Sequence, residues 1–338
     1  MHTRIARLSE RKLGNLTTSA LGYGCMGLSE FYGTPLKKEE AVAIIRHAYE
    51  KRITHFDTAD VYAYGDNEHV LGEAIKSFRD EVTIATKCGI IRHKEDPSAR
   101  GVCNEPDYII KACDESLQRL GLDYIDLFYL HRINPDTPIE ISVGALATLV
   151  EQGKVRYIGL SEADAETIRR AHKIHPITAV QTEYSLWTRG IESNGVLDEC
   201  KKLGIGIVAY SPLGRGFLTG SIKNSNKLEA NDFRRSLPRF SNDHIETNFK
   251  LVDLLEEIAK QKACTPAQLA LAWLLAKDEI IVPIPGTKNL DRLVENVKAL
   301  DIHLNIEDIA YLDRISKENE PMQPRYTEAA MAAYNFSS

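Results

Sequence analysis

The sequence predicts an α/β fold in which eight strand–helix units close into a (β/α)₈ barrel. Strand-like runs rich in Val, Ile and Leu alternate with helical patterns along almost the whole chain. Strands that are apolar on both faces, each followed by a helix, indicate a parallel sheet covered by helices. Eight such units in 338 residues are typical of a closed barrel. We therefore expect residues 1–338 to form one barrel domain, with an N-terminal hairpin, extra helices and a polar C-terminal tail from about residue 317.

The expected elements follow from apolar runs and from apolar residues at helical spacing. A polar hairpin around Gly14 and Asn15 is expected over residues 4–18. The expected strands are residues 20–26, 53–56, 82–87, 124–131, 155–161, 177–181, 205–210 and 280–285. The expected helices are residues 38–51, 68–78, 106–120, 139–152, 165–174, a stretch within 195–203, 245–262, 266–276, 290–300 and 306–316. Residues 91–104 are expected to be a polar loop.

Composition and charge exclude several classes of partner. The net charge is −6 with a pI near 6.0, and Lys and Arg are dispersed, which argues against a nucleic-acid partner. No apolar run is long enough to cross a bilayer, and the basic N-terminus lacks the apolar centre of a secretory signal. The six cysteines have no paired spacing, which is typical of reduced thiols in a cytoplasmic enzyme. His172 and His175 lack a third ligand nearby, so no metal site is expected.

Four titratable side chains lie at or just beyond the ends of successive apolar strands. Asp57 ends the second strand and Tyr62 follows within one loop, whereas Lys87 and His131 end the next two strands. Each side chain alone has a common structural explanation, such as a turn cap for Asp57 or half-buried packing for Tyr62. Because the carboxyl ends of barrel strands meet at one edge, their joint occurrence indicates a single site.

Residues 22–27 satisfy the dinucleotide fingerprint G-x-G-x-x-G, but their context does not fit it. The fingerprint requires a helix that opens on its last glycine and an acidic residue about 20 positions further on. Residues 28–37 instead have the composition of a loop, and the position 20 beyond the last glycine is His47. The sequence therefore does not predict a Rossmann unit, although these glycines allow close approach of the backbone to a ligand.

The ordered motifs of the chain resemble those of the aldo-keto reductase superfamily, as far as about residue 316. The motifs are LGYGCMGL, FDTADVYAYGDNEHVLGEAI, the TK at 86–87, RLGLDYIDLFYLHR, GKVRYIGLSE, YSPLGRGFLTG and VPIPGTKNLDRLVENVKAL. Within the superfamily the chain looks most similar to the pyridoxal reductase and perakine reductase branch. The resemblance implies a (β/α)₈ barrel that uses NADPH without a Rossmann fold, with Asp57, Tyr62, Lys87 and His131 as the catalytic residues.

The resemblance also implies a cofactor site along the same edge. Ser161 and Gln181 match the positions that hold the nicotinamide carboxamide, and Tyr210 matches the aromatic that stacks on the nicotinamide. Glu162 stands where Asn is usual. The remaining positions implied are Gly24, Cys25, Met26, Asp57, Ser211, Pro212, Leu213, Gly214, Arg215, Gly216, Ile284, Gly286, Thr287, Lys288, Arg292, Glu295 and Asn296. A cationic pair such as Lys288 and Arg292 beside a helix start suits an anion and favours NADPH over NADH.

The chemistry of carbonyl reduction suits these residue types. The carbon receives a hydride and the oxygen a proton, and charge forms on the oxygen between the two events. The pKa of an ordinary tyrosine, about 10, is too high for efficient proton exchange at neutral pH. A nearby ammonium lowers it, which is the role expected of Lys87, with Asp57 orienting that ammonium. His131 is expected to donate to, or align, the carbonyl oxygen.

Two functions remain open, and a third is disfavoured. The first is an NADPH-dependent reductase of small or aromatic aldehydes and ketones; the second is a cofactor-holding regulatory or channel-associated subunit with slow turnover. The third, a metal-dependent hydrolase, lacks the required ligand clusters. The substrate and the oligomeric state are not readable from the sequence. The expected substrate pocket is lined by Phe31, Tyr32, Tyr62, Tyr64, His131 and Trp187.

Two segments are expected to lie over the site. Residues 211–243 are polar and glycine-containing and are too long for a plain connector. We expect them to fold over the cofactor as a lid that is mobile without it, with Arg215 contacting the pyrophosphate. The tail, which carries Arg325, Tyr326 and Tyr334, either covers the substrate side or is a frayed terminus.

Overall fold

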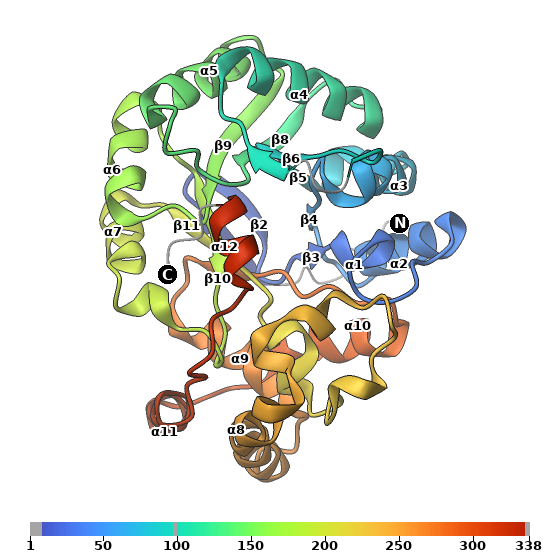
Figure 1. Ribbon diagram of the computed structural model, residues 1–338, viewed down its shortest axis with the longest axis vertical. Coiled ribbons are helices and arrows are strands. Elements are labelled where there is room, and N and C mark those ends of the chain that lie inside the picture. The colour runs from blue at the N-terminus through green and yellow to red at the C-terminus, as the bar shows by residue number, and fades with distance from the viewer. Residues whose placement is uncertain (1–8, 97–99, 335–338) are drawn as a thin grey trace, which may run out of the picture.

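In the computed structural model, which describes residues 9–96 and 100–334, eight parallel strands surround one axis and helices surround the strands (Figure 1). The strands, in their order around the sheet, are β12 (Ile281–Pro283), β11 (Gly206–Tyr210), β10 (Ala179–Glu183), β9 (Val155–Ser161), β8 (Ile125–Leu130), β5 (Thr83–Cys88), β4 (His55–Asp57) and β3 (Tyr23–Gly24). The amide of Gly22 donates to the carbonyl of Pro283 at 2.9 Å, which joins the first strand to the last. The predicted (β/α)₈ barrel is confirmed.

Each barrel strand is followed by a helix that packs on the outside. These helices are α2 (Lys38–Glu50), α3 (Asp66–Ile75), α4 (Pro106–Leu120), α5 (Ile139–Glu151), α6 (Ala165–Ile174), α7 (Val196–Leu203), α9 (Pro266–Lys277) and α10 (Leu290–Val297). The additional helices are α1 (Met26–Ser29), α8 (Asn242–Gln261), α11 (Ile306–Glu318) and α12 (Glu328–Tyr334). Among the described residues, no helix has both the length and the apolar character needed to cross a membrane.

Local sequence signals explain where several helices begin and end. In α9, Thr265 and Gln268 form a capping box that satisfies amides at the helix start, and Pro266 occupies the first turn, where its missing amide hydrogen costs nothing. In α4, Gly121 takes the left-handed conformation that ends the helix. The boundaries of α4, α6 and β9 agree with those predicted from the sequence.

Four segments differ from their predicted structure. The predicted strand 20–26 is reduced to β3, and the short helix α1 begins at Met26 and enters the predicted loop 28–37. Residues 91–104, expected as a plain loop, contain the antiparallel hairpin β6 (Ile90–Arg92) and β7 (Arg100–Val102). Residues 211–243 contain four short 3₁₀ helices, fastened by the buried side chains of Phe217 and Phe240. The tail contains the helix α12. Its polar, irregular pattern did not predict a helix because the segment is ordered by contacts with distant elements.

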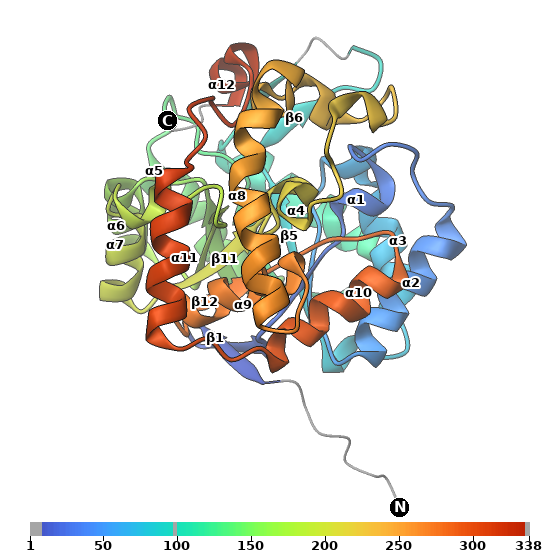
Figure 2. The same ribbon diagram turned by 90° about the horizontal axis from the view of Figure 1, so that it is seen from below.

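The N-terminal hairpin closes the end of the barrel opposite α12 (Figure 2). It comprises β1 (Glu10–Leu13) and β2 (Leu16–Ser19), as predicted, although residues 4–8 of the predicted hairpin lie outside the described residues. Leu13 and Leu16 are buried against inward-facing residues such as Val208 and Val282. A Cβ atom on Gly206 would lie 2.5 Å from the Cα of Leu13. The hairpin therefore fills the barrel interior from below.

Two glycines within helices have different surroundings, and replacing each with alanine should change stability in opposite directions. A Cβ atom on Gly72 would lie 2.2 Å from the carbonyl oxygen of Leu120, whereas a Cβ atom on Gly144 in α5 would meet nothing within 4 Å. Gly72→Ala should lower the free energy of unfolding by about 1–3 kcal/mol, because the backbone at the end of α4 must move to make room for the methyl group. Gly144→Ala should raise it by about 0.5–1 kcal/mol through backbone entropy. Urea unfolding measures both changes, and equal effects would contradict the packing.

A buried histidine inside the barrel predicts a pH dependence of stability. His55 is fully buried, and neither of its ring nitrogens has a hydrogen-bond partner among the described residues. Burial lowers the pKa of His55 to about 4. The unfolded chain therefore binds a proton that the folded chain does not, and stability falls as the pH drops below about 6.5.

From pH 7 to pH 5, His55 should contribute a loss of roughly 2 kcal/mol to the free energy of unfolding. His55→Leu keeps the site apolar and removes the titration. Urea unfolding at the two pH values should show a correspondingly smaller loss for this variant than for the wild type. Parallel pH profiles of the two proteins would show that His55 is not the titrating group.

Candidate active site

The four residues predicted as a catalytic group lie together at the carboxyl ends of β4, β5 and β8. The Nζ atom of Lys87 lies 2.5 Å from Oδ1 of Asp57 and 3.3 Å from the hydroxyl of Tyr62, and it donates to the carbonyl of Thr58 at 2.6 Å. The ring of His131 meets the ring of Tyr62 edge-on, with centroids 5.7 Å apart. All four side chains are buried.

Burial determines the protonation of Tyr62. It raises the pKa of the phenol, while the ammonium of Lys87 acts in the opposite direction. The sequence predicts that Lys87 lowers the pKa of Tyr62 overall, but the desolvation of the phenolate is the larger effect. Tyr62 is therefore a protonated phenol at neutral pH, which suits a proton donor.

The two flanking groups are held in opposite charge states. Although burial disfavours the ammonium, Asp57 and Tyr62 hold the pKa of Lys87 above its ordinary value. Burial, together with the positive charges of Lys87 and Arg132, holds the pKa of His131 well below its ordinary value. His131 is consequently a neutral imidazole and has one N–H to donate.

The turn that carries Tyr62 is strained and is held by residues that the sequence reading missed. Ala63 and Tyr64 have φ of 48° and 55°, a region that side chains rarely adopt. The carboxylate of Glu30 accepts from the amide of Ala63 at 2.9 Å and from both terminal nitrogens of Arg92 at 2.6 and 2.9 Å. Because Arg92 ends β6, the β6–β7 hairpin supports the position of Tyr62.

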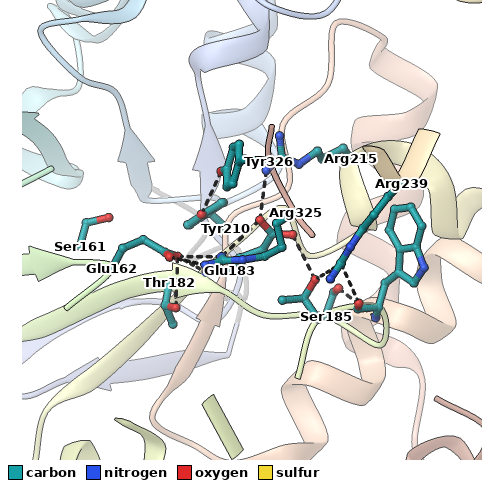
Figure 3. Close-up of polar contacts among 12 residues, drawn as sticks. Ser161, Glu162, Thr182, Glu183, Ser185, Tyr210, Arg215, Arg239, Arg325 and Tyr326 are labelled. Carbon is teal, nitrogen blue, oxygen red and sulfur yellow. Dashed lines mark hydrogen bonds and ion pairs between the residues drawn. The ribbon is translucent and has the colours of Figure 1, made fainter. Parts of the chain in front are cut away.

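The residues predicted to hold a carboxamide lie beside the catalytic group. Gln181 donates from Nε2 to Oδ2 of Asp57 at 2.7 Å, so it connects β10 to β4 across the barrel. Ser161 accepts a hydrogen bond from Arg132 at 3.2 Å, and Tyr210 ends the neighbouring strand β11. Figure 3 shows Ser161 and Tyr210 with the polar residues around them.

The loop after β11 turns sharply around its cation. Ser211, Gly214, Arg215 and Gly216 all have positive φ. The guanidinium of Arg215 is buried and lies 3.1 Å from Oε2 of Glu183. The predicted cation of this loop is thus already paired with a carboxylate.

The two predicted phosphate-binding cations, Lys288 and Arg292, differ in their contacts and exposure. The Nζ atom of Lys288 donates to the carbonyls of Tyr32 and Thr34 at 2.6 and 2.8 Å, so it fastens the loop after α1. Arg292 is exposed and lines an open pocket of about 480 Å³. The pocket is bordered by Thr265, Gln268, Asp291, Arg292, Val294, Glu295 and Lys298. An anion can therefore reach Arg292 without breaking an internal contact, whereas Lys288 is already bonded to two carbonyls.

Two of the remaining predicted cofactor positions, Gly24 and Gly286, lie close together where the first and last strands of the barrel meet. A Cβ atom on Gly286 would lie 2.4 Å from the carbonyl oxygen of Gly24, so the chain after β12 passes very close to β3. The other positions are the buried Cys25, Pro212, Ile284 and Asn296 and the half-buried Met26, Leu213 and Thr287. None of these positions carries a charged side chain.

The aromatic residues expected in the substrate pocket separate into two groups. Phe31 contacts the cluster that contains Tyr62, and Tyr64 is 40% exposed. Trp187 is buried and stacks on Phe217, with ring centroids 4.1 Å apart. The guanidinium of Arg234 lies over the ring of Tyr32 at 4.8 Å. Phe31 and Tyr64 are thus the aromatic residues on the Tyr62 side of the mouth.

Known proteins share this architecture and much of this sequence. The model of the aldo/keto reductase family matches residues 20–317. A probable aldo-keto reductase 1 of Glycine max is 47% identical over 308 residues, which cover 90% of this chain and 88% of the relative. A glycerol dehydrogenase structure from Gluconobacter oxydans is 25% identical with a TM-score of 0.83, covering 96% of this chain and 100% of that one.

A second solved structure was determined with a ligand bound. It is an aldo/keto reductase from Klebsiella pneumoniae in complex with NADP and acetate, 27% identical with a TM-score of 0.72. The match covers 95% of this chain and 99% of that one. With a family match across most of its length and a closely similar relative, this chain belongs to the aldo/keto reductase family of oxidoreductases.

Proposed function

We propose that this protein reduces aldehyde or ketone carbonyls to alcohols with NADPH, and that Tyr62 is the proton donor. The observation that carries the proposal is the buried group of Lys87, Asp57, Tyr62 and a neutral His131 at one edge of the barrel. NADPH bound along this edge would supply the hydride. The family supports carbonyl reduction in general, and the NADP complex of the Klebsiella reductase supports the choice of cofactor.

The side chains of this protein perform the proton chemistry. The phenol of Tyr62 gives its proton to the carbonyl oxygen, and the ammonium of Lys87, 3.3 Å away, stabilises the phenolate that remains. Asp57 keeps Lys87 charged and oriented. The N–H of the neutral His131 donates to the oxygen as negative charge develops on it, an interaction that is stronger in the transition state than in the ground state.

The proposed cofactor residues fit a dinucleotide phosphate. Ser161 and Gln181 offer hydrogen-bonding groups beside the catalytic residues, and the turn around Arg215 places a cation near Tyr210. Arg292 offers an accessible cation for a 2′-phosphate. We propose that residues 211–243 cover the bound cofactor. The resemblance to the pyridoxal and perakine reductases remains a prediction about the substrate class.

We also propose that the chain forms one barrel domain and acts in the cytoplasm. All six cysteines are unpaired, and four of them are buried. Unpaired thiols are typical of proteins in a reducing compartment.

Tyr62→Phe should abolish most turnover while preserving cofactor binding. The substitution removes the hydroxyl and keeps the ring that packs against His131. We expect kcat to fall by about 10²-fold or more, within the range that general acids supply, with little change in the Kd of NADPH. Stopped-flow oxidation of NADPH with an aldehyde panel measures the first quantity and fluorescence titration the second. A variant with wild-type turnover would remove Tyr62 from the mechanism, whereas a wild type that binds NADPH tightly but turns over slowly with every aldehyde would favour a regulatory role.

Arg292→Ala should discriminate between the two nicotinamide cofactors. A charge-assisted contact to the 2′-phosphate contributes roughly 1.5–3 kcal/mol, and NADH lacks that group. The Kd of NADPH should therefore rise by about tenfold or more, while the Kd of NADH stays nearly constant. Arg292 is the better test than Lys288, because Lys288 also fastens the loop at Tyr32 and Thr34. Equal losses for NADPH and NADH would place the 2′-phosphate elsewhere.

A further inference from the structure

Two consecutive residues near the C-terminus contact three barrel positions that the sequence links to the cofactor. We define residues 319–334 as the C-terminal segment; it leaves α11, crosses the carboxyl ends of the strands and ends in α12 (Figure 1). In Figure 3, Arg325 points toward Glu162 and Glu183, and Tyr326 lies over Tyr210. The helix α12 also contacts β7, so the segment spans the mouth of the barrel.

Arg325 compensates a buried carboxylate next to Ser161. Its Nη2 and Nη1 atoms lie 2.8 and 3.2 Å from the two carboxylate oxygens of Glu162, whose side chain is 2% exposed. Burial raises the pKa of Glu162, but the charge and hydrogen bonds of Arg325, the charge of Arg132 and the amide of Glu183 together outweigh it, and the pKa falls to about 2. Glu162 also accepts from the amide of Glu183 at 3.0 Å and has a φ of 53°. A carboxylate held in this way in a strained backbone depends on its partner.

Tyr326 connects the same segment to two further positions. Its hydroxyl lies 3.2 Å from the hydroxyl of Tyr210, and its ring lies 4.6 Å from the guanidinium carbon of Arg215. Arg215 and Arg325 approach the same oxygen of Glu183, at 3.1 and 3.6 Å. The C-terminal segment therefore forms one polar network with the ends of β9 and β11 and with the loop after β11.

We propose that Arg325 is a positioning residue of the cofactor site, and that it acts through Glu162 and, with Tyr326, through Tyr210 and Arg215. This inference rests on the proposed function, because it assumes that NADPH binds along this edge. Groups that are fixed before binding lose less conformational freedom when the ligand arrives. The C-terminal segment thus prepares the site for the cofactor and is more than a cover over the substrate.

The test compares Arg325→Met with Arg314→Met. Arg314 is exposed on α11 and stacks only on the neighbouring Tyr311 in the described contacts, so it controls for the loss of an arginine. We expect Arg325→Met to raise the Kd of NADPH at least tenfold by fluorescence titration and Arg314→Met to leave it unchanged. Arg325→Lys, which keeps the charge but not the two-pronged contact, should recover part of the affinity.

A second measurement begins with the cofactor-free protein. In the cofactor-free protein, amide hydrogen exchange within residues 323–332 should be faster in Arg325→Met than in the wild type. Adding NADPH to the wild type should slow exchange in the same residues, because binding and the docking of the segment are coupled. If Arg325→Met does not fold, the double variant Glu162→Gln with Arg325→Met removes both charges and should fold with an equally weakened affinity for NADPH.

Three outcomes would overturn the inference. An unchanged Kd in a folded variant would show that the pair only fastens the terminus, even if the melting temperature falls. Tighter binding in Arg325→Met would show that the segment obstructs the cofactor. Amide exchange in residues 323–332 that is unchanged by NADPH would show that docking of the C-terminal segment and binding of NADPH are independent. A wild type that does not bind NADPH at all would instead overturn the proposed function, while the exchange difference in the cofactor-free proteins would persist.

Discussion

The buried ion pair between Lys87 and Asp57 is the interaction on which the arrangement of the mouth depends. Removing two charges from water is expensive, and their attraction offsets the cost only where the geometry is good and other hydrogen bonds are present. Here the pair is 2.5 Å apart, and Lys87 also donates to Thr58 while Asp57 also accepts from Gln181. These contacts join β4, β5 and β10. The same pair therefore fixes the ammonium beside Tyr62 and ties opposite sides of the barrel together.

The two ends of the barrel are packed by different kinds of interaction. At the hairpin end, the apolar side chains of Leu13 and Leu16 fill the interior, and a glycine at 206 lets the backbones approach. At the opposite end, buried polar side chains such as Asp57, Lys87 and Glu162 are paired with other polar side chains. Glu30 and Arg92 support the Tyr62 turn, and Arg325 supports Glu162. The hairpin end thus contributes apolar packing, whereas the strained turns and the buried charges lie at the opposite end.

The parts of the structure that the sequence predicted are those determined by local pattern. The apolar strands and amphipathic helices follow from spacing, and the placement of Asp57, Lys87 and His131 follows from the rule that strand ends meet at one edge. The missed parts depend on partners far away in the chain. The role of Arg92 requires Glu30, and that of Arg325 requires Glu162, 163 residues earlier. Neither β6–β7 nor the C-terminal segment has a local pattern strong enough to indicate its contacts.

The pKa of Tyr62 shows that the charges near a residue do not determine its protonation unless its burial is also known. The sequence indicated a lysine close to a tyrosine, and from that pairing alone a lowered pKa follows. The structure adds desolvation, which outweighs Lys87 and raises the pKa of Tyr62. The same burial lowers the pKa of His131, so that a phenol and a neutral imidazole face each other across 5.7 Å. Depth in the barrel, rather than the choice of residues alone, thus gives the site two uncharged hydrogen-bond donors beside one fixed cation.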